Sequence, residues 1–390
     1  MINKSELISY NPYLVKTRRW IHAHPEVGFD VNNTHDFIHS ELQRFGIKVI
    51  THIGKNSLIG VIENGPGEVI GLRADIDALP LYEMNRSLEY VSTNDGVMHA
   101  CGHDSHTAML LTAASYLSNN LDQWKGTVKF IFQEAEEGPN PGGAFGIIES
   151  GYVNDVDHFY ALHVAPMIDS GKIAIKRNEA MASADTIKIT LIGKGAHAAY
   201  PHLSIDPIIM ASEVIQGVQT ILSRRKNPLD LAVITIAKVI AGTTHNIIPE
   251  TAYLEGTVRT FSNELRAFIK VEIDNLLKSV TSRVGGKYEF EYIYEYDPVF
   301  NTSSEVDTIK EVVTSSLGES NFMEIYAQSM GAEDFSKYIF LKQGALAWLG
   351  TRKDESTSYS LHHPLFNLDE DALINGALTL VNLVIYHQKG

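Results

Sequence analysis

The chain has 390 residues, and 32 Lys and Arg against 47 Asp and Glu give a formal net charge of −15. This negative excess argues against nucleic acids and anionic membranes as main partners. A single cysteine excludes an internal disulfide framework and any zinc cluster built from several cysteines. No run approaches the ~20 apolar residues that a membrane helix needs, and the start MINKSELISY lacks the pattern of a signal peptide, so we expect a cytoplasmic location.

The first part of the chain alternates helical and strand patterns. A helical stretch at 5–44, broken at His24-Pro25, precedes a short apolar run at 69–73 that predicts a strand buried on both faces. The pattern continues with a helix at 105–117 and strands at 128–132 and 159–164. Such alternation predicts an α/β fold, with a mostly parallel sheet and helices on both faces.

The order of elements changes after about residue 184. It becomes strand 186–192, helix 206–225, strands 231–240 and 251–258, helix 263–282 and strand 287–294. The order β-α-β-β-α-β is typical of a ferredoxin-like unit. We therefore expect an inserted domain at 185–297, with 1–184 and 298–390 together forming the other domain.

The only cysteine, Cys101, lies in the stretch 99–106 together with three His and one Asp. This stretch precedes a predicted helix, in the kind of loop where open α/β sheets bind ligands. An isolated Cys-x-His is as readily a buried small residue beside polar loop residues. The clustering favours a metal site, because thiolate and imidazole are ligands of zinc and similar metals.

Three carboxylates, those of Glu134, Glu136 and Glu137, follow the predicted strand 128–132. They repel one another unless solvent or a cation offsets their charge. A solvated acidic loop is the ordinary interpretation. Delivery by a buried strand instead favours a site where one Glu binds a metal and its neighbour acts as a general base.

Other metal-binding side chains also follow predicted strands or precede the last helix. They are His163, the pair His362-His363, and Asp75 with Asp77. Because the carboxyl ends of parallel strands meet at one edge of a sheet, these groups predict a single centre for one or two metal ions.

Motifs spread over nearly the whole chain resemble, in the same order, those of a known enzyme family. They are Arg18–His22 with His24–Phe29, Arg73–Pro80, His99–His106, Gly193–His202, Asn246–Glu250, Gly256–Thr260, Gly331–Phe335 and His362–Phe366. The chain resembles the zinc-dependent aminoacylase, carboxypeptidase and auxin-conjugate hydrolase family of metallopeptidases. Within it, the chain is similar to the amidohydrolase branch of hippurate hydrolase and N-acetyldiaminopimelate deacetylase. The resemblance implies an α/β metallo-domain and a ferredoxin-like lid that usually dimerises, hence a homodimer or higher homo-oligomer.

The resemblance also implies roles for individual residues. The implied metal ligands are Cys101, His103, Glu137, His163 and His362, with His363 as the alternative to the last. Glu136 would be the general base, and Asp77 would orient a ligand. Asp75 stands where other branches carry a metal-binding His. The family usually has Pro at the position of Glu134, so we expect the extra charge to alter this loop or the pKa of Glu136.

Three lid residues are implied to act on the substrate. His197 would reach the active site of a partner subunit and support the oxyanion, the alternative being an ordinary surface His. Asn246 and Arg259 would grip the substrate, since Arg binds a carboxylate through two hydrogen bonds. Arg259 could instead be an ion-pair partner within the lid sheet. The segment Gly331–Phe335 would line the pocket.

The expected activity is hydrolysis of an amide bond in a small N-acyl amino acid, with a metal-bound water deprotonated by Glu136. One or two Zn, Mn, Co or Ni ions would serve as the cofactor. A dipeptidase or carboxypeptidase of the same family is the first alternative. An amidase with Cys101 as nucleophile and His103 or His106 as base is the second.

Overall fold

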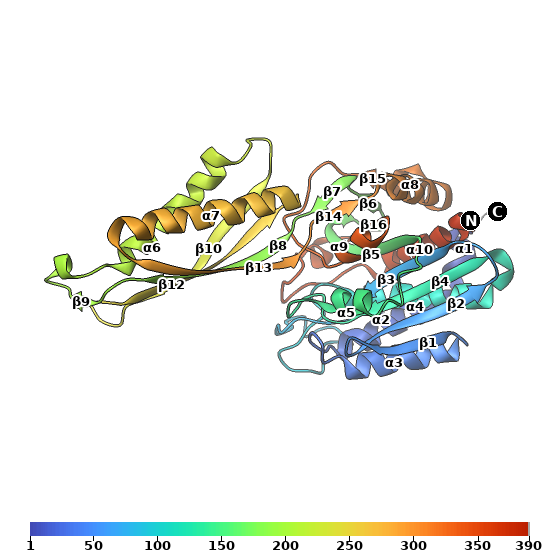
Figure 1. Cartoon of the computed structure of the whole chain (residues 1–390). Coiled ribbons are helices and arrows are strands. Elements are labelled where there is room, and N and C mark those ends of the chain that lie inside the picture. Colours follow the sequence, from blue (N-terminus) through green and yellow to red (C-terminus); the bar gives the residue numbers. More distant parts are fainter. Residues whose placement is uncertain (389–390) are drawn as a thin grey trace. The chain divides into compact units, whose positions relative to one another are not determined.

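A computed structural model describes residues 1–388, which form two compact units (Figure 1). The large unit comprises Met1–Ala180, Phe300–Ala327 and the described residues from Asp334 onward, and the inserted unit comprises Met181–Val299 with Gln328–Glu333. Among the described residues, no helix is both long and apolar enough to cross a bilayer.

The large unit is built on an eight-stranded sheet. In spatial order its strands are β1 (Lys48–Ile53), β2 (Ser57–Asn64), β4 (Gly126–Gln133), β3 (Val69–Asp75), β5 (His158–Asp169), β16 (Gly344–Arg352), β6 (Ile173–Ile175) and β15 (Phe322–Glu324). The central strands β4, β3, β5 and β16 are parallel, whereas β1, β2 and β4 pair antiparallel, as do β6 and β16. The parallel core confirms the predicted class, because continuous apolar runs such as that of β3 suit strands covered on both faces.

Helices cover both faces of this sheet. They are α1 (Lys4–Leu7), α2 (Asn11–Ala23), α3 (Asn32–Arg44), α4 (His103–Asn119), α5 (Gly143–Glu149), α8 (Ser303–Leu317), α9 (Ser336–Leu341) and α10 (Leu373–His387). The neighbours Phe159 and Tyr160 of β5 point to opposite faces. The Phe159 ring lies 5.3 Å from that of Tyr338 on α9, and the Tyr160 hydroxyl lies 2.7 Å from Nε2 of His387 on α10. These contacts place α9 and α10 on opposite sides of the sheet.

The inserted unit has the predicted order of elements. These are β8 (Ala184–Ile192), α6 (Pro207–Thr220), β10 (Ala232–Ala241), β12 (Thr251–Thr260), α7 (Asn263–Val284) and β13 (Lys287–Tyr296). The strands form an antiparallel sheet in the order β10-β12-β8-β13, and both helices pack on it through a separate apolar core. Two short strands, β9 (Ala196–His197) and β11 (Ile247–Ile248), pair with each other, as do β7 (Asn178–Met181) and β14 (Val299–Asn301).

The helix α4 is the central helix of the large unit, and every residue from His103 to Leu117 is buried. Its first turn is held by an ion pair between α2 and α4. Arg18 Nε lies 2.8 Å from Asp104 Oδ2, and both side chains are completely buried. The same oxygen accepts from His22 Nδ1 at 2.8 Å. Burial lowers the pKa of Arg18, but the carboxylates of Asp104 and Glu370 outweigh it and raise this pKa above its usual value.

Breaking this pair tests how far the first turn of α4 depends on it. We expect Asp104→Ala to lower the free energy of unfolding of the large unit by about 3–5 kcal/mol, because it leaves the Arg18 charge buried without its main partner. Denaturant unfolding followed by circular dichroism measures the change. The matched control is Asp307→Asn, which breaks an exposed pair with Arg177 and should cost at most about 1 kcal/mol. Equal losses in the two variants would contradict a structural role for the buried pair.

Candidate metal centre

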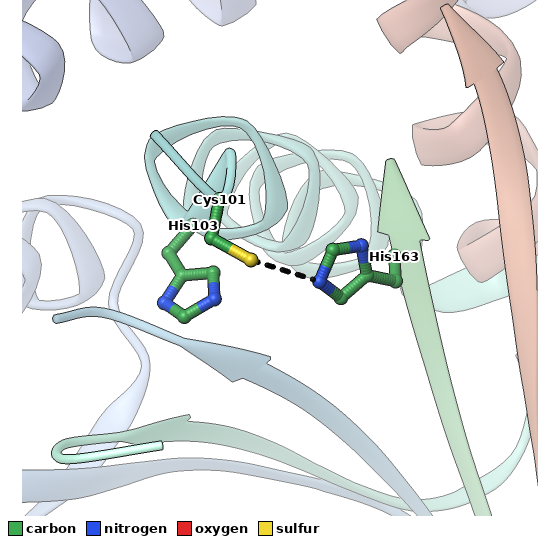
Figure 2. A group of neighbouring side chains, drawn as sticks. All are labelled: Cys101, His103 and His163. Carbon is green, nitrogen blue, oxygen red and sulfur yellow. Dashed lines mark hydrogen bonds between the residues drawn. The ribbon is translucent and has the colours of Figure 1, made fainter. Parts of the chain in front are cut away.

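Three of the predicted ligands converge at the carboxyl end of the parallel sheet. Cys101 and His103 lie where the chain enters α4, and His163 lies on β5 (Figure 2). Cys101 Sγ is 3.4 Å from His163 Nε2. The Nδ1 atoms of His163 and His103 face the backbone carbonyls of Val164 and Asp77 at 2.8 and 2.9 Å. Each Nε2 is therefore turned toward the centre, as in rings whose other nitrogen is held by a carbonyl while they bind a metal.

Gly102 allows Cys101 and His103 to reach this position. It adopts a left-handed conformation with φ of +83°, and a Cβ atom at this position would lie 2.3 Å from the Val164 side chain. Only glycine tolerates both the conformation and this close approach to β5. The turn thus brings the thiol and the imidazole to the same side of the strand end.

The loop after β4 adds two carboxylates, which Asp77 holds in place. The Asp77 carboxylate accepts hydrogen bonds from the backbone N–H groups of Glu136 at 3.0 Å and Glu137 at 3.1 Å. Its Oδ1 also lies 3.4 Å from His103 Nδ1. Ala135 is left-handed with φ of +51°, an uncommon conformation for a residue other than glycine. The bend directs the two consecutive Glu side chains into the centre, where Glu136 Oε2 is 3.9 Å from His103 Nε2.

The geometry distinguishes the neighbours His362 and His363. His362 Nε2 lies 3.0 Å from Glu137 Oε1, and the His362 backbone N–H donates to the Ala100 carbonyl. His363 instead stacks on Tyr359, and its Nδ1 accepts the backbone N–H of Leu365 at 3.0 Å. Of the two, His362 is the residue directed at the carboxylate of the centre.

Together these side chains form overlapping groups whose possible ligand atoms lie within 4.8 Å of one another. The groups are Cys101 with His103 and His163, Cys101 with Glu137 and His362, and His103 with Glu136 and Glu137. Nε2 of His103 is buried and has no hydrogen-bond partner among the described residues. A buried ring nitrogen beside carboxylates fits the role of a metal ligand, since buried polar atoms are otherwise almost always paired.

The electrostatics of the centre point the same way. Burial, together with the carboxylates of Glu137 and Glu136, raises the pKa of the Cys101 thiol well above its usual value. Burial alone would lower the pKa of His103, but Asp75 and Asp77 raise it to about 10. For His163, burial and the nearby His106 lower the pKa to about 3, so this ring is neutral. The centre therefore concentrates negative charge that a cation would offset. The loop that carries Glu136 is not a solvated acidic loop, because Glu136 is only 6% exposed.

Asp75 is held by other side chains. Its Oδ2 pairs with Arg73 Nη1 at 2.6 Å, and its Oδ1 lies 2.6 Å from His106 Nδ1. His106 Nε2 in turn accepts the backbone N–H of Val164 at 2.9 Å. Arg73 also reaches Asp334 Oδ1 at 2.8 Å. Asp75 thus ties the strand ends together, and its Oδ2 also lies 3.7 Å from His103 Nε2.

Two charged networks were missed by reasoning from the sequence, those of Arg18 with Asp104 and of Arg73 with Asp334. Arg73 did leave a signal, because it is a charged residue inside an apolar run predicted to be buried. A buried arginine needs a carboxylate partner. The partner, Asp334, is 261 positions away and could not be identified without the fold.

The extra carboxylate of Glu134 points away from the centre. Its two oxygens accept the backbone N–H groups of Lys55 at 2.8 Å and Asn56 at 2.6 Å. Burial raises its pKa, against these hydrogen bonds. Glu134 therefore holds the loop between β1 and β2 in place. The extra carboxylate affects its own loop by anchoring it to residues 55–56.

The three substrate-binding candidates lie in the inserted unit, at two ends of its sheet. His197 on β9 is exposed. It pairs in register with Ile247, the residue that directly follows Asn246. Arg259 lies near the far end of β12, and its guanidinium makes no ion pair or hydrogen bond within the part of the chain that the structure describes. The role of Arg259 therefore stays a prediction. From Thr251 to Arg259, β12 spans about 26 Å at ~3.3 Å per residue.

Known proteins share this fold and sequence. The model of peptidase family M20/M25/M40 matches residues 71–386. An N-acyl-L-amino acid amidohydrolase of Geobacillus stearothermophilus is 40% identical over 289 residues, which are 74% of this chain and 78% of that protein. Thermostable carboxypeptidase 1 of Saccharolobus solfataricus is 34% identical over 98% of this chain and 97% of that protein.

A solved structure agrees with these matches. The crystal structure of a dinuclear metal-binding peptidase of the M20 family from Bacillus subtilis is 34% identical to this chain. It superposes with a TM-score of 0.85 over 98% of this chain and 99% of that one. The chain belongs to peptidase family M20/M25/M40.

Proposed function

We propose that this enzyme hydrolyses the amide bond of a small N-acyl amino acid with the help of one or two divalent cations. The observation that carries the proposal is the convergence of Cys101, His103, Glu137, His163 and His362, whose possible ligand atoms form overlapping sets that share members. Cys101, His103 and His163 are buried, whereas His362 is exposed at the rim. The amidohydrolase relative supports the substrate class. The dinuclear neighbour supports a pair of ions.

The donor atoms define the class of metal. One thiol, several imidazoles and carboxylates suit Zn, Mn, Co or Ni better than Mg or Ca. When bound, such ions make water a stronger acid and polarise a carbonyl group. Overlapping sets that share Cys101, His103 and Glu137 favour two neighbouring ions over one.

Glu136 is the proposed general base. Its backbone N–H is held by Asp77, and its carboxylate lies among the ligands. It takes the proton from the attacking water and passes it to the leaving amine, so that a carboxylic acid and an amino acid result. Asp77 is a positioning residue, since it holds the Glu136–Glu137 backbone and the His103 ring together.

The lid residues are proposed to come from two subunits. His197 and Arg259 are separated by most of the length of β12, about 26 Å, so one small substrate cannot touch both within a single inserted unit. In a homodimer, Arg259 would bind the substrate carboxylate, and His197 of the partner subunit, beside Asn246, would support the oxyanion. Such an exchange requires a two-fold dimer.

The main alternative is a dipeptidase or carboxypeptidase, which the similarity to the Saccharolobus solfataricus carboxypeptidase favours. A Cys101 nucleophile fits less well, because nucleophilic thiols have lowered pKa values whereas burial raises that of Cys101. Screening acetyl-, benzoyl- and succinyl-amino acids against dipeptides, with each metal added, tests the substrate class. Preference for N-acyl amino acids, lost on chelation and restored by metal, is the expected result, and preference for dipeptides would replace the proposal with the alternative.

Removing the proposed base should separate chemistry from metal binding. We expect Glu136→Gln to lower kcat by about 10²–10⁴-fold, the range for a general base, because the amide cannot take a proton from water. Elemental analysis should find the metal content unchanged. Near-normal turnover of this variant would contradict the assignment of Glu136 as the general base.

The neighbours His362 and His363 offer a matched test of the ligand set. We expect His362→Ala and Cys101→Ala to lose bound metal, since each removes a donor from the centre. His363→Ala should retain it, because this ring faces Tyr359 and Leu365. Metal content after gel filtration is the readout, and full occupancy in Cys101→Ala would count against the thiol as a ligand.

Mixing two inactive variants tests the exchange between subunits. His197→Ala and Glu136→Gln should each be nearly inactive alone, since one oxyanion donor contributes roughly 2.7–4 kcal/mol. Co-expressed in equal amounts, they should recover about a quarter of wild-type activity, because about half of the dimers are mixed and each mixed dimer holds one intact site. No recovery, in dimers shown to be mixed, would place His197 in the site of its own subunit.

A further inference from the structure

A second cluster of metal-binding side chains lies at the opposite end of the same parallel strands. Glu68 directly precedes β3, His158 begins β5, and His387 ends α10. Their possible ligand atoms lie within 4.8 Å of one another. His158 lies five positions before His163 on β5, so at ~3.3 Å per residue this cluster is about 16 Å from the centre described above.

The two imidazoles converge on one carboxylate oxygen. His387 Nδ1 lies 2.9 Å and His158 Nε2 lies 3.5 Å from Glu68 Oε2. The rings are in contact but tilted, with their centroids 4.0 Å apart and an angle of 32° between their planes. Both rings thus present a nitrogen to the same side, which a simple pairing of one His with one Glu does not require.

The other nitrogen of each ring faces a second, buried carboxylate. His158 Nδ1 lies 3.2 Å from Glu305 Oε1, and Glu305 is 1% exposed. His387 Nε2 lies 2.7 Å from the Tyr160 hydroxyl, which donates to Glu305 Oε2. Histidines that bind a metal are commonly oriented in this way, with a carboxylate or another acceptor on the far nitrogen.

The charge of the cluster suits a cation. Among residues 1–388, neither Glu68 nor Glu305 forms an ion pair with Lys or Arg, so their counter-charges are the two imidazoles alone. The side chains of His158 and His387 are 11% and 8% exposed, whereas that of Glu68 is 48% exposed. The cluster is therefore rigid on its inner side and open to solvent at the carboxylate, where an ion would enter.

We propose that Glu68, His158 and His387 form a second, structural site for a divalent cation of the zinc type. Two imidazoles and one carboxylate are a frequent zinc ligand set, and water would complete the coordination. The imidazoles select Zn²⁺, Co²⁺ or Ni²⁺ over Mg²⁺ and Ca²⁺. The ion would join the segment before β3, the start of β5 and the last turn of α10, three regions far apart in the sequence.

Zinc counting in matched variants tests this site. The full-length protein, His387→Gln and Glu68→Gln are equilibrated with buffered free Zn²⁺, freed of unbound metal and analysed for zinc. Each variant should hold about one Zn²⁺ per chain less than the wild type, since each loses a ligand. Amide hydrolysis should be unchanged, because neither residue belongs to the centre at Cys101.

Two controls guard against indirect effects. Tyr386→Phe removes a hydroxyl from the same helix turn, and Glu63→Gln removes an exposed charge from β2, but neither removes a proposed ligand. Both should bind as much zinc as the wild type. In addition, Zn²⁺ but not Mg²⁺ should raise the melting temperature of the wild type further than that of Glu68→Gln. Equal zinc content in the wild type, His387→Gln and Glu68→Gln would overturn the proposal, as would loss of the same zinc in the controls.

Discussion

The structure depends on burying several carboxylates at the carboxyl end of β3 and β4. Glu136, Glu137 and Asp77 meet there with the Cys101 thiol and the His103 and His163 imidazoles, in surroundings from which water is largely excluded. Buried charges of one sign are unfavourable unless an opposite charge compensates them. A cation bound by these side chains supplies that charge, so the same interaction that stabilises the loop would also provide the chemistry of amide hydrolysis.

The rest of the large unit holds this arrangement in place. Gly102 lets the chain turn closely against β5, Asp77 holds the two Glu backbones, and the Arg73 ion pairs join the strand ends. Behind them, the buried pair of Arg18 and Asp104 secures the first turn of α4. Such supporting contacts are what keep ligands and a general base in working geometry.

Much of this was accessible from the sequence, and the exceptions have physical reasons. The strands of the parallel core, the βαββαβ insertion and the clustering of Cys101 with His103 follow from periodicity and spacing. The strands β1, β2, β6 and β15 were not predicted. β6 and β15 have only three residues each, and β1 is half-exposed, so these three lack a strong apolar pattern. The pairing of Arg73 with Asp334 depends on contacts across the fold, and the choice between His362 and His363 required their side-chain directions.

The parallel strands thus carry His-rich clusters at both of their ends, one buried around Cys101 and one open at Glu68. The central claim is that the cluster around Cys101 binds the catalytic metal. Anomalous diffraction at the zinc edge from crystals of the zinc-loaded protein tests it most directly. The account predicts a strong peak about 2.3 Å from the sulfur of Cys101 and about 2.0–2.1 Å from an imidazole nitrogen. Anomalous density confined to Glu68, His158 and His387, with none beside Cys101 in an active enzyme, would contradict it.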